Sequence, residues 1–96
     1  MPTIYKYLGI FFYFWSNDHD PIHVHAKYQG MECKVLLYPD GRIEVDNYLL
    51  SKNMDPQTLR KIERFAIKYK DKIKKKWSDY HLYGKKLKPE IITRAV

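Results

Sequence analysis

The sequence contains very little cysteine and no long hydrophobic run. Cys33 is the one cysteine among 96 residues, so no internal disulfide can form. Because residues 32–37 read as the interior of a strand, we expect a small buried thiol there and not a reactive one. The longest apolar run, residues 10–15, is far shorter than the roughly 20 residues of a membrane span, and the opening residues do not resemble a secretion signal. We therefore expect a protein of the reducing cytoplasm with no membrane partner.

The signatures of several common enzyme classes are also missing. The four glycines do not form a glycine-rich phosphate-binding loop, and no serine or cysteine nucleophile has a plausible partner base. Nothing in the sequence calls for a cofactor. The length fits a single domain over residues 1–96, large enough to bury one core without metal or disulfide staples.

Acidic residues are scarce in the second part of the chain. Residues 56–96 carry 13 lysines and arginines against 4 acidic residues, a net charge of +9. Residues 1–55 carry 5 against 7, a net charge of −2. This asymmetry points to a polyanionic or acidic partner that meets the C-terminal part.

Hydrophobic alternation predicts strands in the first part of the chain. Residues 10–15 are apolar on both faces, which is typical of a central strand. Residues 22–28 alternate, with Val24 and Ala26 on one face and His23 and His25 on the other.

The dipeptide Gln29-Gly30 predicts a tight hairpin between this strand and residues 32–38. If Tyr28 pairs with Met31, then Lys27 meets Glu32, and His25 meets Lys34.

A long helix is predicted from Pro56 to about residue 81. Asp55 can cap its first turn, and Pro56 suits the first helical position. Apolar residues recur every three or four positions, and we expect this stripe to pack on the face of Val24, Val35, Leu37 and Val45; its members are Leu59, Ile62, Ala66, Tyr69, Ile73, Trp77 and Tyr80. At 1.5 Å per residue the helix would be near 40 Å long. Its last turns must therefore bend or pack on another chain, which would permit a homodimer.

Together these patterns predict an α+β fold. An antiparallel sheet of three to four strands covers about residues 3–46, the long basic helix covers about 56–81, and a basic tail covers 85–96.

The densest group of reactive side chains lies in residues 18–25, with three histidines and two aspartates. His23 and His25 leave the same face of a strand, with Cα atoms about 6.6 Å apart. One hypothesis is metal-free acid–base cleavage of RNA, in which these two histidines exchange protons and Lys34 or Lys27 neutralises the phosphate.

Two other roles compete for the same histidines. One is a metal site in which His19 and His81 converge on His23 and His25. Local geometry fixes only two of those ligands, so we expect no metal. The other is a structural role as half-exposed strand residues satisfied by Glu32, Glu44 or backbone groups, which is the commonest role for such residues.

A row of basic residues is predicted on one flank of the helix. It could follow the phosphates of a nucleic acid, and its members are Lys61, Arg64, Lys68, Lys72 and Lys75. Glu63 and Asp71 dilute the row, so a solvated face that keeps the protein soluble is the competing interpretation.

Residues 1–4, the aromatic strand, residues 16–25 and the helix end at residues 77–81 together resemble the bacterial domain of unknown function 4160 family over most of the chain. The chain departs from this family pattern in three places. Ile22 stands where members usually have a second proline, and Leu82 and Tyr83 separate His81 from Gly84, whereas in members glycine commonly follows the histidine directly. Residues 85–96 look additional. The resemblance implies a small protein partner encoded nearby, in a gene pair of the toxin–antitoxin type. It implies no catalytic residues.

We therefore expect a component of a two-protein toxin–antitoxin-like module that acts on RNA through the histidine-bearing face and the basic helix. If it is an enzyme, a metal-independent ribonuclease is the first hypothesis. The alternatives are a non-enzymatic protein-binding or regulatory module with structural histidines, and a small metal-binding protein.

Overall fold

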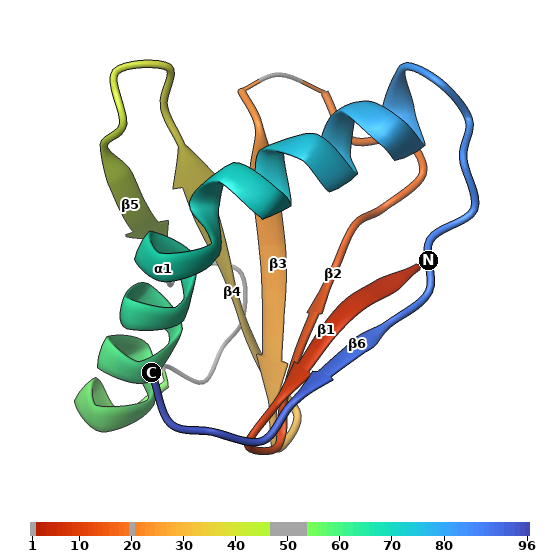
Figure 1. Ribbon diagram of the computed structural model, residues 1–96. Coiled ribbons are helices and arrows are strands. Elements are labelled where there is room, and N and C mark those ends of the chain that lie inside the picture. The colour runs from red at the N-terminus through yellow and green to blue at the C-terminus, as the bar shows by residue number, and fades with distance from the viewer. Residues whose placement is uncertain (1, 20, 47–53) are drawn as a thin grey trace.

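The computed structural model describes residues 2–19, 21–46 and 54–96. Within them one long helix packs against a single twisted sheet, so the predicted α+β class is confirmed (Figure 1). The strands are β1 (Thr3–Tyr7), β2 (Ile10–Tyr13), β3 (His23–Tyr28), β4 (Met31–Leu37), β5 (Ile43–Asp46) and β6 (Glu90–Ile92), and the helix is α1 (Pro56–His81).

The sheet has six strands in the order β5-β4-β3-β2-β1-β6. The predicted number, three to four antiparallel strands, was too low. Strands β1 to β5 form an antiparallel meander, whereas β6 lies parallel to β1 and makes the sheet mixed. Residues 85–96 are therefore not only a basic tail. The strand β6 has three residues, too few for alternation to reveal it in the sequence.

The hairpin between β3 and β4 has the predicted register. Tyr28 pairs with Met31, and His25 pairs with Lys34. Gln29 and Gly30 both have positive φ angles, 49° and 79°, as a two-residue hairpin turn that follows the sheet's twist requires.

The helix α1 begins at Pro56, as predicted. The Asp55 carboxylate accepts hydrogen bonds from the backbone N–H of Thr58 (3.2 Å) and from its hydroxyl (2.7 Å). Figure 1 shows α1 changing direction part-way, so that it wraps around the core, and the bend expected from its length is present. No helix in the described part of the chain is long and apolar enough to cross a membrane.

Phe65 is the centre of the aromatic core between α1 and the sheet. Its ring centroid lies 4.5 Å from that of Phe12 and 4.7 Å from that of Tyr7. Val24 and Val35 are fully buried in the same cluster, so the helix covers the predicted face. The strand alternation then turns His23 and His25 towards the other face.

Cys33 is fully buried in this core, as predicted. Burial raises the pKa of its thiol to about 12, so the thiolate is not available near neutral pH.

Candidate functional site

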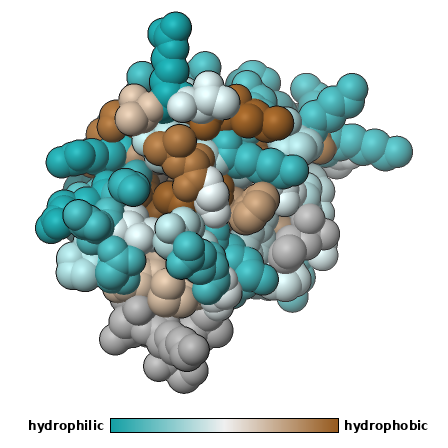
Figure 2. All heavy atoms as spheres, turned by 90° about the horizontal axis from the view of Figure 1, so that it is seen from below, coloured by the Kyte–Doolittle hydropathy of each residue, from teal (hydrophilic) through white to brown (hydrophobic). Residues whose placement is uncertain are grey.

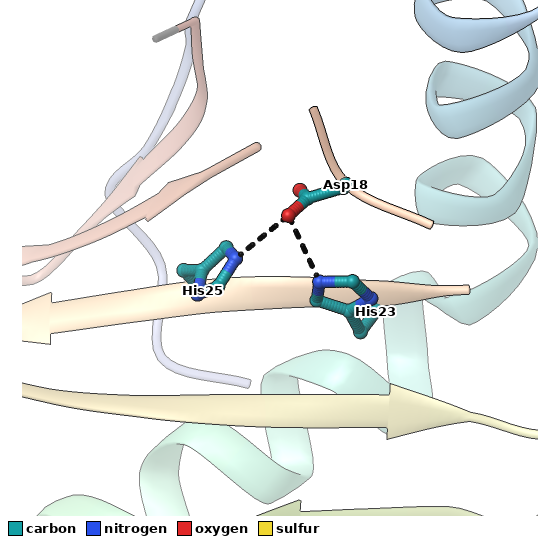
Figure 3. A group of neighbouring side chains, drawn as sticks. All are labelled: Asp18, His23 and His25. Atoms are coloured by element: carbon teal, nitrogen blue, oxygen red, sulfur yellow. Dashed lines mark hydrogen bonds and ion pairs between the residues drawn. The ribbon is translucent and has the colours of Figure 1, made fainter. Parts of the chain in front are cut away.

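Asp18, His23 and His25 bring three side chains together at strand β3 (Figure 3). Oδ1 of Asp18 lies 3.1 Å from Nε2 of His23 and 3.3 Å from Nε2 of His25. All three atoms lie within 4.8 Å of one another, and we call this group the Asp18 cluster.

A turn after β2 positions Asp18. Its Oδ2 accepts a hydrogen bond from the backbone N–H of Trp15 (2.8 Å), and its own N–H donates to the Trp15 carbonyl (3.2 Å). Nε2 of His81, on the last turn of α1, lies 3.1 Å from the same carbonyl oxygen. The end of the helix therefore holds the turn that carries the carboxylate.

Backbone geometry fixes the orientation of the His23 ring. Its Nδ1 lies 2.8 Å from the carbonyl oxygen of Pro21. Because a carbonyl can only accept, Nδ1 must be the donor. Nε2 of His23 is then the atom that faces Asp18 (Figure 3).

Aromatic rings enclose the two histidines. Tyr13 stacks on His25 with centroids 5.3 Å apart, and Trp77 of α1 lies 5.1 Å from the His23 ring. Each histidine keeps 8% of its surface exposed. Burial lowers the pKa of His25, the Asp18 carboxylate opposes that shift, and the charges of His23 and Lys34 add to it.

An open hollow of about 560 Å³ borders the cluster. Asp18 is part of its wall, together with Ser16, Asn17, His19, Trp77, His81 and Leu82. The carboxylate therefore lies between the two enclosed histidines and a polar recess that a small molecule or solvent can enter.

Comparison with models of known protein families finds one family that matches this sequence. A family model described as Domain of unknown function (DUF4160) matches residues 9–78, well over half of the chain. The chain belongs to the DUF4160 family. The matched part of this DUF4160 protein contains Asp18, His23 and His25, whereas His81 and β6 lie beyond it. No curated protein and no solved structure matches the chain.

The structure of this DUF4160 protein changes the expected surroundings of the histidines. They are buried and not half-exposed, and Asp18 contacts them in place of the expected Glu32 and Glu44. The expected backbone partner is present for His23, whose Nδ1 lies at the Pro21 carbonyl oxygen. The sequence signal for Asp18 was present, because it belongs to the dense group of residues 18–25.

The proposed four-histidine set does not come together. Among the described residues, the converging ligand atoms belong to Asp18, His23 and His25, and His19 is an exposed residue outside that group. His81 is also outside it, because its two ring nitrogens lie 3.3 Å and 3.1 Å from the carbonyl oxygens of Trp77 and Trp15. Lys34 lies opposite His25 on β4, as expected.

The predicted basic row on α1 is exposed to solvent in this DUF4160 protein. All of its members are exposed, namely Lys61, Arg64, Lys68, Lys72 and Lys75. Lys75 forms an ion pair with Asp79 (3.0 Å), and Nζ of Lys72 lies 5.5 Å from the centroid of the Tyr69 ring. We call these five residues the basic flank.

The end of the sheet with the β1–β2 turn exposes apolar side chains. Figure 2 shows hydrophobic atoms gathered in the middle of this end, with hydrophilic residues around them. Leu8, Phe11 and Ile91 are 46%, 43% and 70% exposed, and they line a hollow of about 350 Å³ beside Lys6. Such a surface is typical of a contact with another protein.

Proposed function

We propose that this DUF4160 protein is a cytoplasmic RNA-binding component of a two-protein toxin–antitoxin-like module. The observation that carries the proposal is the basic flank. Its five cations are exposed along one helix and span about 21 Å at 1.5 Å per residue. A row of this kind gives binding energy through phosphate contacts and counterion release, without reading base sequence.

The module partner is assigned to a different surface. The apolar hollow beside Leu8, Phe11 and Ile91 favours a protein contact, since these side chains stay in water in the single chain. This arrangement leaves the basic flank free for RNA. A protein-binding or regulatory module without RNA is the second candidate function, and the apolar hollow is the observation that favours it.

The burial of His23 and His25 is a steric obstacle to the ribonuclease hypothesis, in which these histidines act together with Lys34. Each histidine is 8% exposed, and Asp18 contacts both Nε2 atoms. A general acid or base must come within hydrogen-bond reach of the substrate atom. Cleavage through these rings would therefore require the turn that carries Asp18 to move away.

A salt titration tests RNA binding. The anisotropy of a labelled single-stranded RNA is measured from about 50 to 200 mM salt, where the log–log slope should be about −0.7 per phosphate contacted. The double substitution Lys68→Glu and Lys72→Glu should weaken binding and flatten the slope.

The matched control is Lys6→Glu with Lys27→Glu, because both residues are exposed strand residues and the change in net charge is equal. This control should keep most of the slope. An equal loss in both double variants, or no binding at about 50 mM salt, would assign the basic flank to solubility alone.

A further inference from the structure

Two of the three distances within the Asp18 cluster are close to those between neighbouring ligands of one metal ion. Zinc bonds to histidine nitrogen and carboxylate oxygen are about 2.0–2.2 Å long, so neighbouring ligands in a tetrahedral site lie roughly 3.3–3.6 Å apart. The two distances from Oδ1 of Asp18 are 3.1 Å and 3.3 Å. Since all three ligand atoms lie within 4.8 Å of one another, small side-chain rotations would bring them onto one ion.

The hydrogen-bond roles of His23 also favour a cation. Its Nδ1 donates to the Pro21 carbonyl, so in the neutral ring Nε2 presents a lone pair to Oδ1 of Asp18, which is also an acceptor. Two acceptors 3.1 Å apart need a proton or a metal ion between them. Donation from the other ring nitrogen to a backbone carbonyl is the usual support of a metal-ligating histidine.

The surroundings match those of a metal site with an open position. Oδ2 of Asp18 is held by the Trp15 N–H, so Oδ1 alone points into the cluster. Tyr13 and Trp77 exclude water from the histidine rings. The open hollow has Asp18 in its wall, so solvent reaches the carboxylate that would hold the metal.

We propose that Asp18, His23 and His25 form a mononuclear site for a divalent transition metal, with three protein ligands and solvent at the open coordination positions. Two imidazoles and one carboxylate suit zinc or iron(II), and they disfavour the harder magnesium ion. The proposal uses residues on the sheet face and goes beyond the RNA-binding function, which rests on the basic flank.

Calorimetric titration of the chelator-treated protein tests this site, with zinc and, under anaerobic conditions, iron(II) as the probes. We expect one equivalent of zinc or iron(II) to bind and magnesium not to bind. The comparison of the two affinities identifies the preferred metal. His23→Gln and His25→Gln should each weaken binding by more than about 100-fold, since losing a ligand costs more than losing a supporting residue.

The matched control is His19→Gln, because it removes an exposed histidine next to Asp18 in the sequence that lies outside the cluster. It should keep most of the affinity. Asp18→Asn keeps the size of the side chain, and its folding is checked by circular dichroism, so a folded Asn variant without metal binding would support the site. No one-to-one binding by the native chain, or an equal loss in His19→Gln, would overturn the proposal.

The outcomes for metal and RNA can be separated. RNA anisotropy is measured in chelator, and zinc binding is measured without RNA. A protein that binds RNA but no metal loses this inference only, and a protein that binds metal but no RNA loses the proposed function only.

Discussion

Nε2 of His23, at the beginning of β3, lies 3.1 Å from Oδ1 of Asp18, in the turn after β2. His23 is fixed by β3, and Asp18 is fixed by its bonds to the backbone of Trp15. His81 reaches the same Trp15 carbonyl from the end of α1. The geometry of the cluster therefore depends on the docking of the helix end as well as on the strand.

Trp77 is the main packing contact of that helix end. It is 5% exposed and contacts the rings of Phe14 (5.5 Å) and His23 (5.1 Å). We expect Trp77→Ala to lower the free energy of unfolding by about 3–5 kcal/mol, measured by urea denaturation. Leu82→Ala is the control, because Leu82 is 71% exposed and its loss should change stability by less than about 0.5 kcal/mol. Similar values for the two variants would contradict this packing role.

Asp18 should stabilise the fold even without metal. In chelator, Asp18→Ala should lower the free energy of unfolding by about 1–3 kcal/mol, because the Trp15 N–H and the His25 ring lose their shared acceptor. Asp71→Ala, at an exposed position of α1, should change stability by no more than about 0.5 kcal/mol. Thermal and urea unfolding of both variants measure this. If Asp18→Ala is as stable as the native chain, the cluster does not hold the turn.

The sequence predicted the parts of the fold that depend on local signals. The Gln29-Gly30 turn fixes the hairpin, and the pairing of His25 with Lys34 follows from it by counting. Asp55 and Pro56 fix the beginning of the helix through a cap and a preset φ angle. These features need only residues a few positions apart.

The features that depend on distant residues could not be predicted. The strand β6 is defined by its partner β1, more than 80 positions earlier, and three residues show no useful alternation. Asp18 lies in an irregular turn, where no hydrophobic periodicity indicates the direction of a side chain. Its convergence on His23 and His25 depends on α1 packing against the turn after β2.

Cys33 provides a probe of global unfolding. Since burial raises the pKa of its thiol from 9.0 to about 12, the thiolate fraction near pH 8 should be about 10³-fold below that of an unfolded chain. Reaction with a thiol reagent at pH 8 should therefore be very slow until denaturant is added. The unfolded thiol ionises first as pH rises above 9, so its contribution to stability should fall between pH 9 and 12. Rapid native-state labelling would contradict the burial.

The attachment of β6 should depend on pH. Nζ of Lys76 lies 2.7 Å from Oε2 of Glu90, and this ion pair lowers the pKa of Glu90 below its ordinary value of 4.5. The contribution is present above pH 4.5 and is lost as pH falls through the lowered value. Hydrogen exchange of the β6 amides, corrected for its intrinsic pH dependence, should become faster in that range. Glu90→Gln should show fast exchange at all pH values, and an unchanged pH response in this variant would contradict the assignment.

Crystals grown with zinc, with anomalous diffraction recorded on both sides of the zinc absorption edge, test the proposed metal site of Asp18, His23 and His25 most directly. We expect one strong anomalous peak about 2.0–2.2 Å from Oδ1 of Asp18 and from Nε2 of His23 and His25. His25→Gln crystals should lose that peak. A peak only at His19 or His81, or no peak in crystals of the zinc-saturated native chain, would show that these three residues do not form a metal site.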